Sequence, residues 1–298
     1  MGWSAADIPD LGGKRVIVTG ANSGIGLKTA LELARHGADT VLACRSRERG
    51  EAALRLISDA VPAAKVSLAL VDLADLSSIR AFADEQVKTP LDVLINNGGV
   101  MAIPRAVTAD GFERQFGTNH LGHFALTGLL LPALLEREGA RVVTVTSLMS
   151  NAARTLDFAD LQGERKYSKW LAYGRAKLAN LLFAKELDRR VPSVASLAAH
   201  PGYANTELTA NSAKTSGSRI AALTYTAGRI LAQSGAAGAL PTLRAATDPT
   251  AQGGECYGPR LLARGAPVRT SLHPRADDPT LATTLWTASE NLTNIHYP

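Results

Sequence analysis

The chain has 298 residues, of which 46% are hydrophobic and 20% are charged, a balance typical of a globular protein and not of a disordered one. Its formal net charge of +5 comes from 32 basic and 27 acidic residues that are scattered along the chain. No cationic block marks a nucleic-acid-binding tail, so we expect no nucleic-acid partner. Two cysteines, Cys44 and Cys256, are too few for a disulfide framework or a thiolate metal site.

The first ten residues lack the basic and apolar regions of a signal peptide. The most apolar run, residues 126–135, contains Pro132 and is shorter than the about 20 residues that span a bilayer. We therefore expect a cytoplasmic protein with no integral membrane segment.

Strand and helix patterns alternate along the first two thirds of the chain. Strands are expected at 16–19, 40–43, 65–71, 93–96, 141–146 and 194–199, with helices at 25–36, 47–60, 76–87, 111–136 and 173–190. The later part predicts a loop at 211–219, helices at 220–234 and 236–247, a strand at 253–258, and a last helix capped by Asp278 that ends near residue 291. This alternation predicts an α/β fold with a doubly wound parallel sheet and helices on both faces.

The pattern contains no internal repeat and no low-complexity linker. We therefore expect a single domain over residues 1–298. Within it, we expect a core over residues 10–200 and a lid with C-terminal elements over residues 201–298.

A glycine-rich turn follows the first expected strand at once. Gly20, Gly24 and Gly26 lie between the apolar run 16–18 and an amphipathic helix. Such a strand–turn–helix unit binds the pyrophosphate of a dinucleotide, because glycines let the backbone approach the phosphates and the helix N-terminus supplies free N–H donors. The spacing differs from the commoner Gly-x-Gly-x-x-Gly, and a turn that binds nothing is the alternative.

Arg45 follows the second strand, where dinucleotide-binding folds contact the adenosine ribose. An acid at this point accepts the 2′-hydroxyl of NAD, whereas an arginine accommodates the 2′-phosphate of NADP. The sequence has no acid at this strand end, so we predict NADP(H) as cofactor in preference to NAD(H). The alternative is that Arg45, Arg47 and Arg49 form the solvated first turn of a helix.

Asp72 and Leu73 end the third strand, where such folds contact the adenine. Capping of the turn before Leu76 is an equally good interpretation of Asp72.

Tyr173 and Lys177 lie four residues apart, and hence on one face of a helix. A phenol has a pKa of about 10, and a nearby cation lowers that pKa, so Tyr173 is a candidate acid/base. Ser147 ends the fifth parallel strand and is placed to donate to a substrate oxygen. The alternative is a Tyr–Lys pair on a solvated helix face.

Two further motifs complete the pattern. Asn96-Asn97-Gly98-Gly99 ends the fourth strand and lets the nicotinamide approach the backbone, and Asn119 lies in the next helix. Together with the glycine turn, Ser147, the Tyr173/Lys177 pair and Pro201-Gly202, these residues resemble the short-chain dehydrogenase/reductase family.

The resemblance implies a seven-stranded Rossmann fold and a catalytic tetrad of Asn119, Ser147, Tyr173 and Lys177. Tyr173 would be the acid/base, Ser147 would orient the substrate, Lys177 would also bind the nicotinamide ribose, and Asn119 would hold a water. Asn96 would brace the sheet. The implied cofactor-binding residues are Gly20, Asn22, Ser23, Gly24, Ile25, Gly26, Arg45, Asp72, Leu73, Asn97, Gly98, Gly99, Tyr173, Lys177, Pro201, Gly202 and Thr206.

Gly98 departs from the family, which usually has alanine there, and we expect slightly looser packing. The insertion at 161–169, the stretch 43–45 and the ending 281–286 are similar to the retinol dehydrogenase-like, NADP-preferring branch. That similarity does not establish a retinoid substrate. Dimers of the family usually pair helices equivalent to 111–136 and 173–190, so a homodimer or homotetramer is expected.

His120 and His123 lack a third ligand at a suitable spacing, and we expect no metal site. His200 is expected to be structural or to line the cofactor pocket. Ser147 is not a hydrolase nucleophile, because Thr146-Ser147-Leu148-Met149 is not a G-x-S-x-G turn.

These patterns predict an oxidoreductase that transfers a hydride between NADP(H) and a substrate. The substrate, a small-molecule carbonyl or alcohol, is the expected partner. Tyr203, Leu208 and Tyr225, in the expected pocket wall, favour an apolar substrate. The alternative is a non-catalytic NADP-binding sensor or scaffold. A light-dependent tetrapyrrole reductase is disfavoured by the two cysteines and the missing transit segment.

Overall fold

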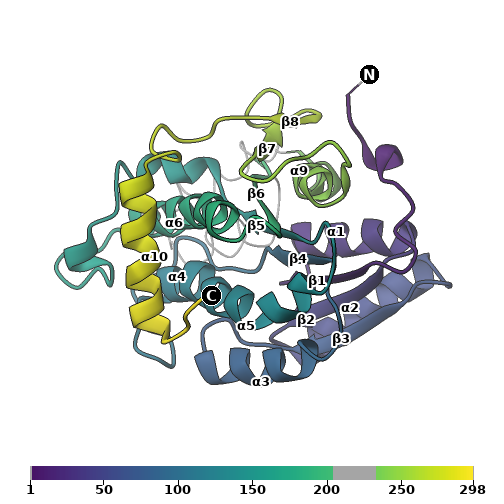
Figure 1. Cartoon of the computed structure of the whole chain (residues 1–298), viewed down its shortest axis with the longest axis horizontal. Coiled ribbons are helices and arrows are strands. Elements are labelled where there is room, and N and C mark those ends of the chain that lie inside the picture. Colours follow the sequence, from purple (N-terminus) through teal and green to yellow (C-terminus); the bar gives the residue numbers. More distant parts are fainter. Residues whose placement is uncertain (1, 204–232, 298) are drawn as a thin grey trace, which may run out of the picture.

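A computed structural model of the chain describes residues 2–203 and 233–297. In this part of the chain, eight strands form one sheet in the order β3-β2-β1-β4-β5-β6-β7-β8 (Figure 1). The strands are β1 (Arg15–Thr19), β2 (Asp39–Cys44), β3 (Val66–Leu70), β4 (Val93–Asn96), β5 (Arg141–Val145), β6 (Ala195–Ala199), β7 (Cys256–Pro259) and β8 (Pro267–Arg269). All neighbours pair in parallel except β7 and β8, which are antiparallel.

The doubly wound parallel sheet is thereby confirmed, with one correction to the expected seven strands. The extra strand, β8, follows a tight turn after β7 and returns along its free edge. An antiparallel return needs only a short connection, whereas a parallel strand needs a crossover of a dozen or more residues.

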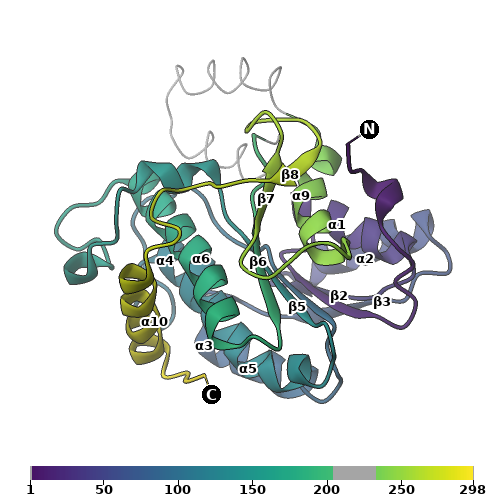
Figure 2. The same ribbon diagram turned by 45° about the horizontal axis from the view of Figure 1, so that its top comes forward.

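Helices cover both faces of the sheet (Figures 1 and 2). The α-helices are α1 (Gly24–Arg35), α2 (Arg47–Ala60), α3 (Leu76–Gln86), α4 (Arg114–Phe116), α5 (Gly122–Leu135), α6 (Lys169–Arg190), α9 (Gly235–Thr247) and α10 (Pro279–Thr293). Short 3₁₀ turns lie at Ala5–Asp7, Leu148–Ala152 and Phe158–Asp160.

The two faces have separate cores because successive strand residues point to opposite sides. Val16 and Val18 of β1 pack with α1, α2 and α9, whereas Ile17 packs with α3, α5 and α6. All three side chains are buried, as expected for a parallel strand that is covered on both sides.

The helix expected at 111–136 is interrupted, which is a second correction. It consists of α4, a π-helical turn η2 (Gly117–Leu121) and α5. At this turn the N–H of Gly122 bonds the carbonyl of Gly117, five residues back. Such π turns occur frequently at functional sites, and this one contains Asn119.

Two other expectations differ from the structure or lie outside it. Helix α6 begins at Lys169, four residues before the expected start. The predicted loop 211–219 lies outside the described residues, as does the predicted helix 220–234 except for its last two positions. There Ser234 caps α9, with its side chain accepting from Ala237 N.

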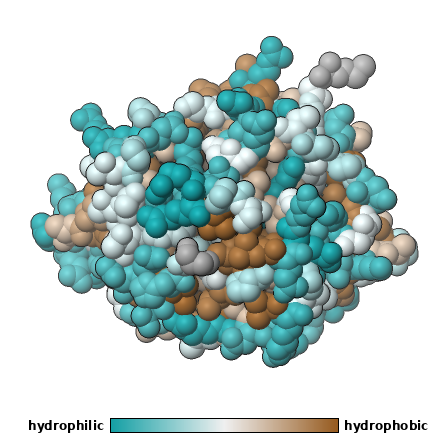
Figure 3. Space-filling view, viewed as in Figure 1, coloured by the Kyte–Doolittle hydropathy of each residue, from teal (hydrophilic) through white to brown (hydrophobic). Residues whose placement is uncertain are grey.

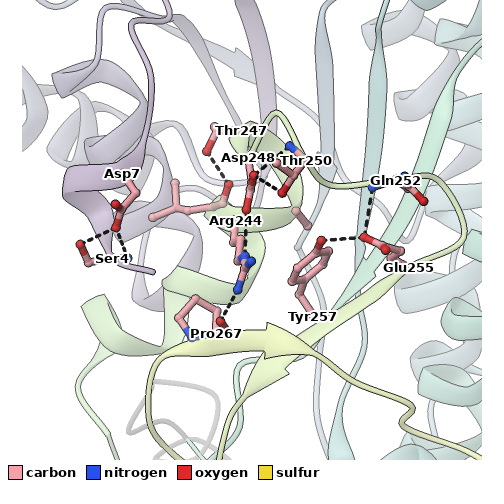
Figure 4. Close-up of polar contacts among 12 residues, drawn as sticks. Ser4, Asp7, Arg244, Thr247, Asp248, Thr250, Gln252, Glu255, Tyr257 and Pro267 are labelled. Carbon is pink, nitrogen blue, oxygen red and sulfur yellow. Dashed lines mark hydrogen bonds and ion pairs between the residues drawn. The ribbon is translucent and has the colours of Figure 1, made fainter. Parts of the chain in front are cut away.

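Polar contacts fix the β7–β8 hairpin to α9 (Figure 4). Arg244 of α9 donates to Asp248 and to the carbonyl of Pro267, and its guanidinium lies 5.2 Å from the ring centre of Tyr257. The Tyr257 hydroxyl in turn donates to Glu255 at 2.6 Å. The hairpin is thereby held rigidly at the edge of the sheet.

Helix α10 packs against α6 and brings the C-terminal residues onto α5. Trp286 of α10 is 2% exposed and contacts the rings of Phe124, Phe183 and Tyr297. The Tyr297 hydroxyl donates to the backbone of Phe124 at 2.7 Å. The chain's own C-terminal helix therefore covers apolar parts of the two helices on which dimer pairing was expected.

Candidate active site

The motifs singled out in the sequence meet at one edge of the sheet. β1, β4 and β5 are neighbours and run parallel, so their carboxyl ends lie side by side. The glycine turn follows β1, Asn97-Gly98-Gly99 follows β4, and Ser147 follows β5. This is the edge at which open α/β sheets bind their ligands.

The glycine turn is built for close backbone approach. Gly20 and Gly24 have positive φ angles of 65° and 55°, which L side chains rarely adopt. A Cβ on Gly26 would lie 2.4 Å from the Gly20 carbonyl oxygen, and one on Gly20 would lie 2.7 Å from Gly98 Cα. Among the described residues, Ser23 makes no side-chain capping bond to α1. The free N–H groups of this helix start and the cradle in front of them fit a pyrophosphate.

Hydrogen bonds hold the turn against the neighbouring strands. Gly20 N donates to the Ala43 carbonyl at 2.8 Å, and the amides of Ala21 and Asn22 bond Cys44. Asn97 Nδ2 donates to the Thr19 carbonyl at 2.8 Å. Cys44 is buried and burial raises its pKa to about 11, so it remains a neutral thiol. Sequence reasoning did not assign Cys44 or Thr19 this role, because neither belongs to a motif readable from spacing.

Arg45 lies between β2 and the cap of α2. It precedes the N-cap Ser46, whose side chain accepts from Arg49 N, and it is not part of the helix. Its guanidinium is exposed and lies 4.0 Å from a carboxylate oxygen of Asp72, which follows β3. Arg45 therefore lies beside the ends of β2 and β3, on the side of the glycine turn where a ribose phosphate was expected.

Asp75 and Asp72 accept hydrogen bonds from different backbone amides after β3. Asp75 is the N-cap of α3 and accepts from Ser77 and Ser78. Asp72 instead closes a turn by accepting from Ala74 N at 2.9 Å. Leu73 fills the space in front of Gly98, where an added Cβ would lie 2.8 Å from Leu73 Cδ1. The looser packing expected at Gly98 is therefore wrong, since a leucine methyl group occupies the place of the missing Cβ.

The side chain of Asn119 clamps the loop after β4. Its Oδ1 accepts from Val100 N at 2.8 Å, and its Nδ2 donates to the Val100 carbonyl at 2.9 Å. A Cβ on Gly99 would lie 2.7 Å from this Oδ1, so the glycine permits the contact. The side-chain amide of Asn119 is thus bonded to the Val100 backbone. The backbone carbonyl of Asn119, in the π turn, remains as the group that can make other contacts.

Asn96 has a bracing role away from this loop. Its Nδ2 donates to Thr127 Oγ1 of α5 at 2.9 Å and lies 3.5 Å from Thr144 Oγ1 of β5. The buried amide therefore connects β4 to its neighbouring strand and to the covering helix.

Tyr173 and Lys177 face the sheet and not the solvent. They are 7% and 4% exposed, which rules out the solvated helix face. Lys177 Nζ donates to the Val145 carbonyl at 2.8 Å and lies 5.8 Å from the Tyr173 ring centre. Asn180 donates to the same carbonyl at 3.2 Å, and Thr146 Oγ1 donates to the Lys177 carbonyl. These bonds dock α6 on the end of β5, next to Ser147.

The electrostatics of this pair differ from the simple expectation. Burial raises the pKa of Tyr173 to about 12, and a hydrogen bond with Ser147 opposes that rise. Burial likewise lowers the pKa of Lys177 to about 8. The expected lowering of the tyrosine pKa by the lysine is therefore wrong for this arrangement, because burial dominates the shift and only the Ser147 hydrogen bond opposes it.

Pro201 and Gly202 follow β6 and join the hairpin. Gly202 has a φ of 66°, and Gln233 Nε2 donates to the Pro201 carbonyl at 2.6 Å. Tyr203 is 41% exposed and donates through its backbone to Ala263. Thr206, Leu208 and Tyr225 lie outside the described residues.

The remaining histidines have structural contacts. His120 Nε2 bonds Ser289 Oγ at 2.9 Å, and His123 contacts Thr19 and Asn119. A Cβ on Gly258 would lie 1.9 Å from His200 Nε2, so that ring packs on the backbone of β7. Over residues 2–203 and 233–297, no three His, Cys, Asp or Glu side chains cluster as metal ligands.

Comparison with known proteins places this geometry in a family. A family model described as short chain dehydrogenase matches residues 14–217. The chain belongs to the short-chain dehydrogenase family. It is 48% identical over 204 residues to retinol dehydrogenase 12 of Mus musculus, covering 67% of this chain and 64% of that protein. It is 50% identical over 210 residues to retinol dehydrogenase 13 of Homo sapiens, covering 69% and 62%. The matched part thus spans less than two thirds of these relatives.

Solved structures share the fold. An uncharacterized protein from Mycobacterium paratuberculosis is 44% identical and covers all of both chains, with a TM-score of 0.83. A protein from Beutenbergia cavernae, assigned as an NAD(P) dependent gluconate 5-dehydrogenase, contains NADP at low occupancy. It is 27% identical and covers 84% of this chain and 96% of its own, with a TM-score of 0.66. The resemblance to retinol dehydrogenase-like members of the family is confirmed.

No helix among the described residues of this short-chain dehydrogenase is both long and apolar enough to cross a membrane.

Proposed function

We propose that this short-chain dehydrogenase transfers a hydride between NADP(H) and a carbonyl or alcohol substrate. The observation that carries the proposal is the buried Tyr173/Lys177 pair, docked beside Ser147 at the end of β5 and on the same sheet edge as the glycine turn. When bound, the nicotinamide supplies or accepts the hydride at the substrate carbon.

The protein's own residues manage the oxygen of the substrate. Tyr173, with a pKa raised to about 12 by burial, carries its proton at neutral pH and donates it to a carbonyl oxygen that gains negative charge. Ser147 donates a second hydrogen bond and holds the oxygen in front of the phenol. The Lys177 ammonium, 5.8 Å from the ring centre of Tyr173, stabilises the phenolate that remains after proton transfer. The protonated phenol is the form that carbonyl reduction uses, and alcohol oxidation uses the phenolate.

NADP(H) is proposed over NAD(H) because of Arg45. Its guanidinium is exposed at the ends of β2 and β3, and the carboxylate of Asp72 is 4.0 Å away. A planar cation with several donors matches a phosphate dianion. The NADP in the Beutenbergia protein is consistent with this choice.

The expected substrate is a small apolar carbonyl or alcohol, in line with the similarity to retinol dehydrogenases. We retain the proposed division of one domain into a core at 10–200 and a lid with C-terminal elements at 201–298. The proposed homodimer or homotetramer uses a surface other than the part of α6 under α10. Figure 3 shows hydrophobic residues gathered over α5 beside the C-terminus, which is one such surface.

The test of this function is Tyr173→Phe, with NADPH consumption measured on a panel of ketones and aldehydes. Loss of the proton donor is expected to lower kcat by about 10²–10⁴-fold while NADPH still binds. Tyr257→Phe is the matched control, because Tyr257 lies on β7 and its hydroxyl bonds Glu255, the residue before that strand, and not the site. Turnover that survives in Tyr173→Phe would disprove the proposed acid.

The alternative, a sensor or scaffold that binds NADP without turnover, is separated by the same panel. Saturable NADPH binding with no consumption for any carbonyl would favour it over the enzyme.

A further inference from the structure

The imidazole of His123 links two parts of the candidate site. It is 1% exposed on the first turn of α5. Its Nε2 lies 2.9 Å from Thr19 Oγ1 at the end of β1, and its Nδ1 lies 2.9 Å from the backbone oxygen of Asn119 in the π turn. One ring therefore connects the start of the glycine turn to the segment that holds Asn119.

The hydrogen-bond inventory determines which ring nitrogen carries the proton. Thr19 Oγ1 accepts from the backbone N–H groups of Asn97 and Gly98, each at 2.9 Å, and these two bonds use both of its lone pairs. Its own O–H then has two acceptors within reach, His123 Nε2 at 2.9 Å and the Ile95 carbonyl at 3.2 Å, and it donates to the nearer one, Nε2. The ring proton must lie on Nδ1, where it donates to the Asn119 carbonyl. The opposite tautomer would direct Nε2–H at a filled oxygen and the Nδ1 lone pair at a carbonyl.

The ring is neutral at physiological pH. Burial lowers the pKa of His123 to about 4, and the charge of Lys177 contributes to that lowering. A neutral imidazole with one donor and one acceptor satisfies both neighbours at once, which a cation with two donors would not.

We propose that His123 is a positioning residue that holds the Asn119 carbonyl and the Asn97–Gly98 backbone in one fixed relation at the site. The chain of bonds runs from the Asn97 and Gly98 amides to Thr19, from Thr19 to His123, and from His123 to Asn119. Removal of the imidazole breaks the hydrogen-bonded path from Thr19 at the end of β1 to Asn119 in the π turn. This inference rests on the proposed function, and it deepens that function by giving a positioning role to a residue that the sequence offered only as a metal-ligand candidate.

The first experiment compares His123→Phe with His120→Phe. The two histidines are equally buried and three residues apart, but His120 bonds Ser289 of α10 and packs among aromatic rings. His123→Phe is expected to lower kcat by at least about tenfold, because small displacements at a reacting site are costly, with Kd for NADPH within about threefold. His120→Phe is expected to lower Tm and to leave kcat unchanged.

Two conservative variants separate positioning from general packing. An asparagine at 123 keeps a donor near the place of Nδ1, and a glutamine keeps an acceptor near the place of Nε2. His123→Asn is expected to recover kcat in part, and His123→Gln is expected to recover the exchange protection described next. A kcat within about twofold of wild type in His123→Phe would overturn the proposal.

Hydrogen exchange supplies a readout that does not need turnover. The amides of Asn97 and Gly98 are expected to exchange faster in His123→Phe than in wild type, and at the wild-type rate in His120→Phe. If the wild-type protein does not consume NADPH with any carbonyl of the panel, the proposed function fails. In that case hydrogen exchange still tests the positioning role of His123. An unchanged exchange rate over residues 95–100 in His123→Phe overturns that role, and a faster rate supports it.

Discussion

At the scale of single residues, the site depends on side chains that are taken out of water. Tyr173 and Lys177 were predicted as a pair from their spacing, and the structure places them together at the end of β5. Their pKa values move in the directions that burial dictates, upward for the phenol and downward for the ammonium. Spacing reveals which groups meet, but the balance between dehydration and attraction depends on packing.

A residue-scale prediction concerns Arg45. Arg45→Ala is expected to raise KM for NADPH by about tenfold or more, because a charge-assisted hydrogen bond contributes about 1.5–3 kcal/mol, and to leave KM for NADH unchanged. Steady-state kinetics with both cofactors measure the effect. Arg47→Ala is the control, since Arg47 lies in α2 and pairs with Glu51. Equal efficiency of the wild type with NADH and NADPH would defeat the assignment.

At the scale of elements, α10 replaces solvent on the outer side of α6. Trp286 lies in a cluster of aromatic rings, and the Arg190 guanidinium lies 4.7 Å from its ring centre. The sequence predicted this helix and its Asp278 cap, whose side chain accepts from Leu281 N. Where it docks was not predictable, because an amphipathic pattern states that a face is buried but not against which partner.

Trp286→Ala is accordingly expected to lower the free energy of unfolding by about 3–5 kcal/mol, the cost of a large cavity in a core. Trp170→Ala serves as the comparison, since Trp170 is 44% exposed and its loss is expected to cost about 0.5 kcal/mol or less. Urea unfolding followed by circular dichroism measures both. Similar losses in the two variants would mean that α10 is not a structural part of the core.

At the scale of the whole molecule, three buried histidines link stability to pH. Burial lowers the pKa of His120 to about 3 and those of His123 and His200 to about 4. Between these values and 6.5 the unfolded chain binds protons that the folded chain does not. Stability is therefore complete above pH 6.5 and falls as the pH drops toward 4.

The expected loss at pH 5 is about 2 kcal/mol for each histidine relative to pH 7. Denaturant unfolding between pH 5 and 7.5 measures this loss. His120→Phe is expected to reduce the pH dependence of the free energy of unfolding by the contribution of one histidine. A stability that does not change over this range would show that the rings are protonated as easily in the folded chain as in the unfolded one.

The sequence by itself determined the strand–helix alternation, the doubly wound parallel sheet and the candidate site residues, because these depend on local periodicity and on motifs at strand ends. Gly20, Gly26, Ser147, Tyr173 and Lys177 all lie where their patterns placed them. Only the tertiary structure decided the eighth strand, the π turn at Asn119, the leucine that fills the space beside Gly98 and the ring of His123 between the end of β1 and the π turn. Those features depend on contacts between residues far apart in the chain, and local patterns carry no record of such contacts.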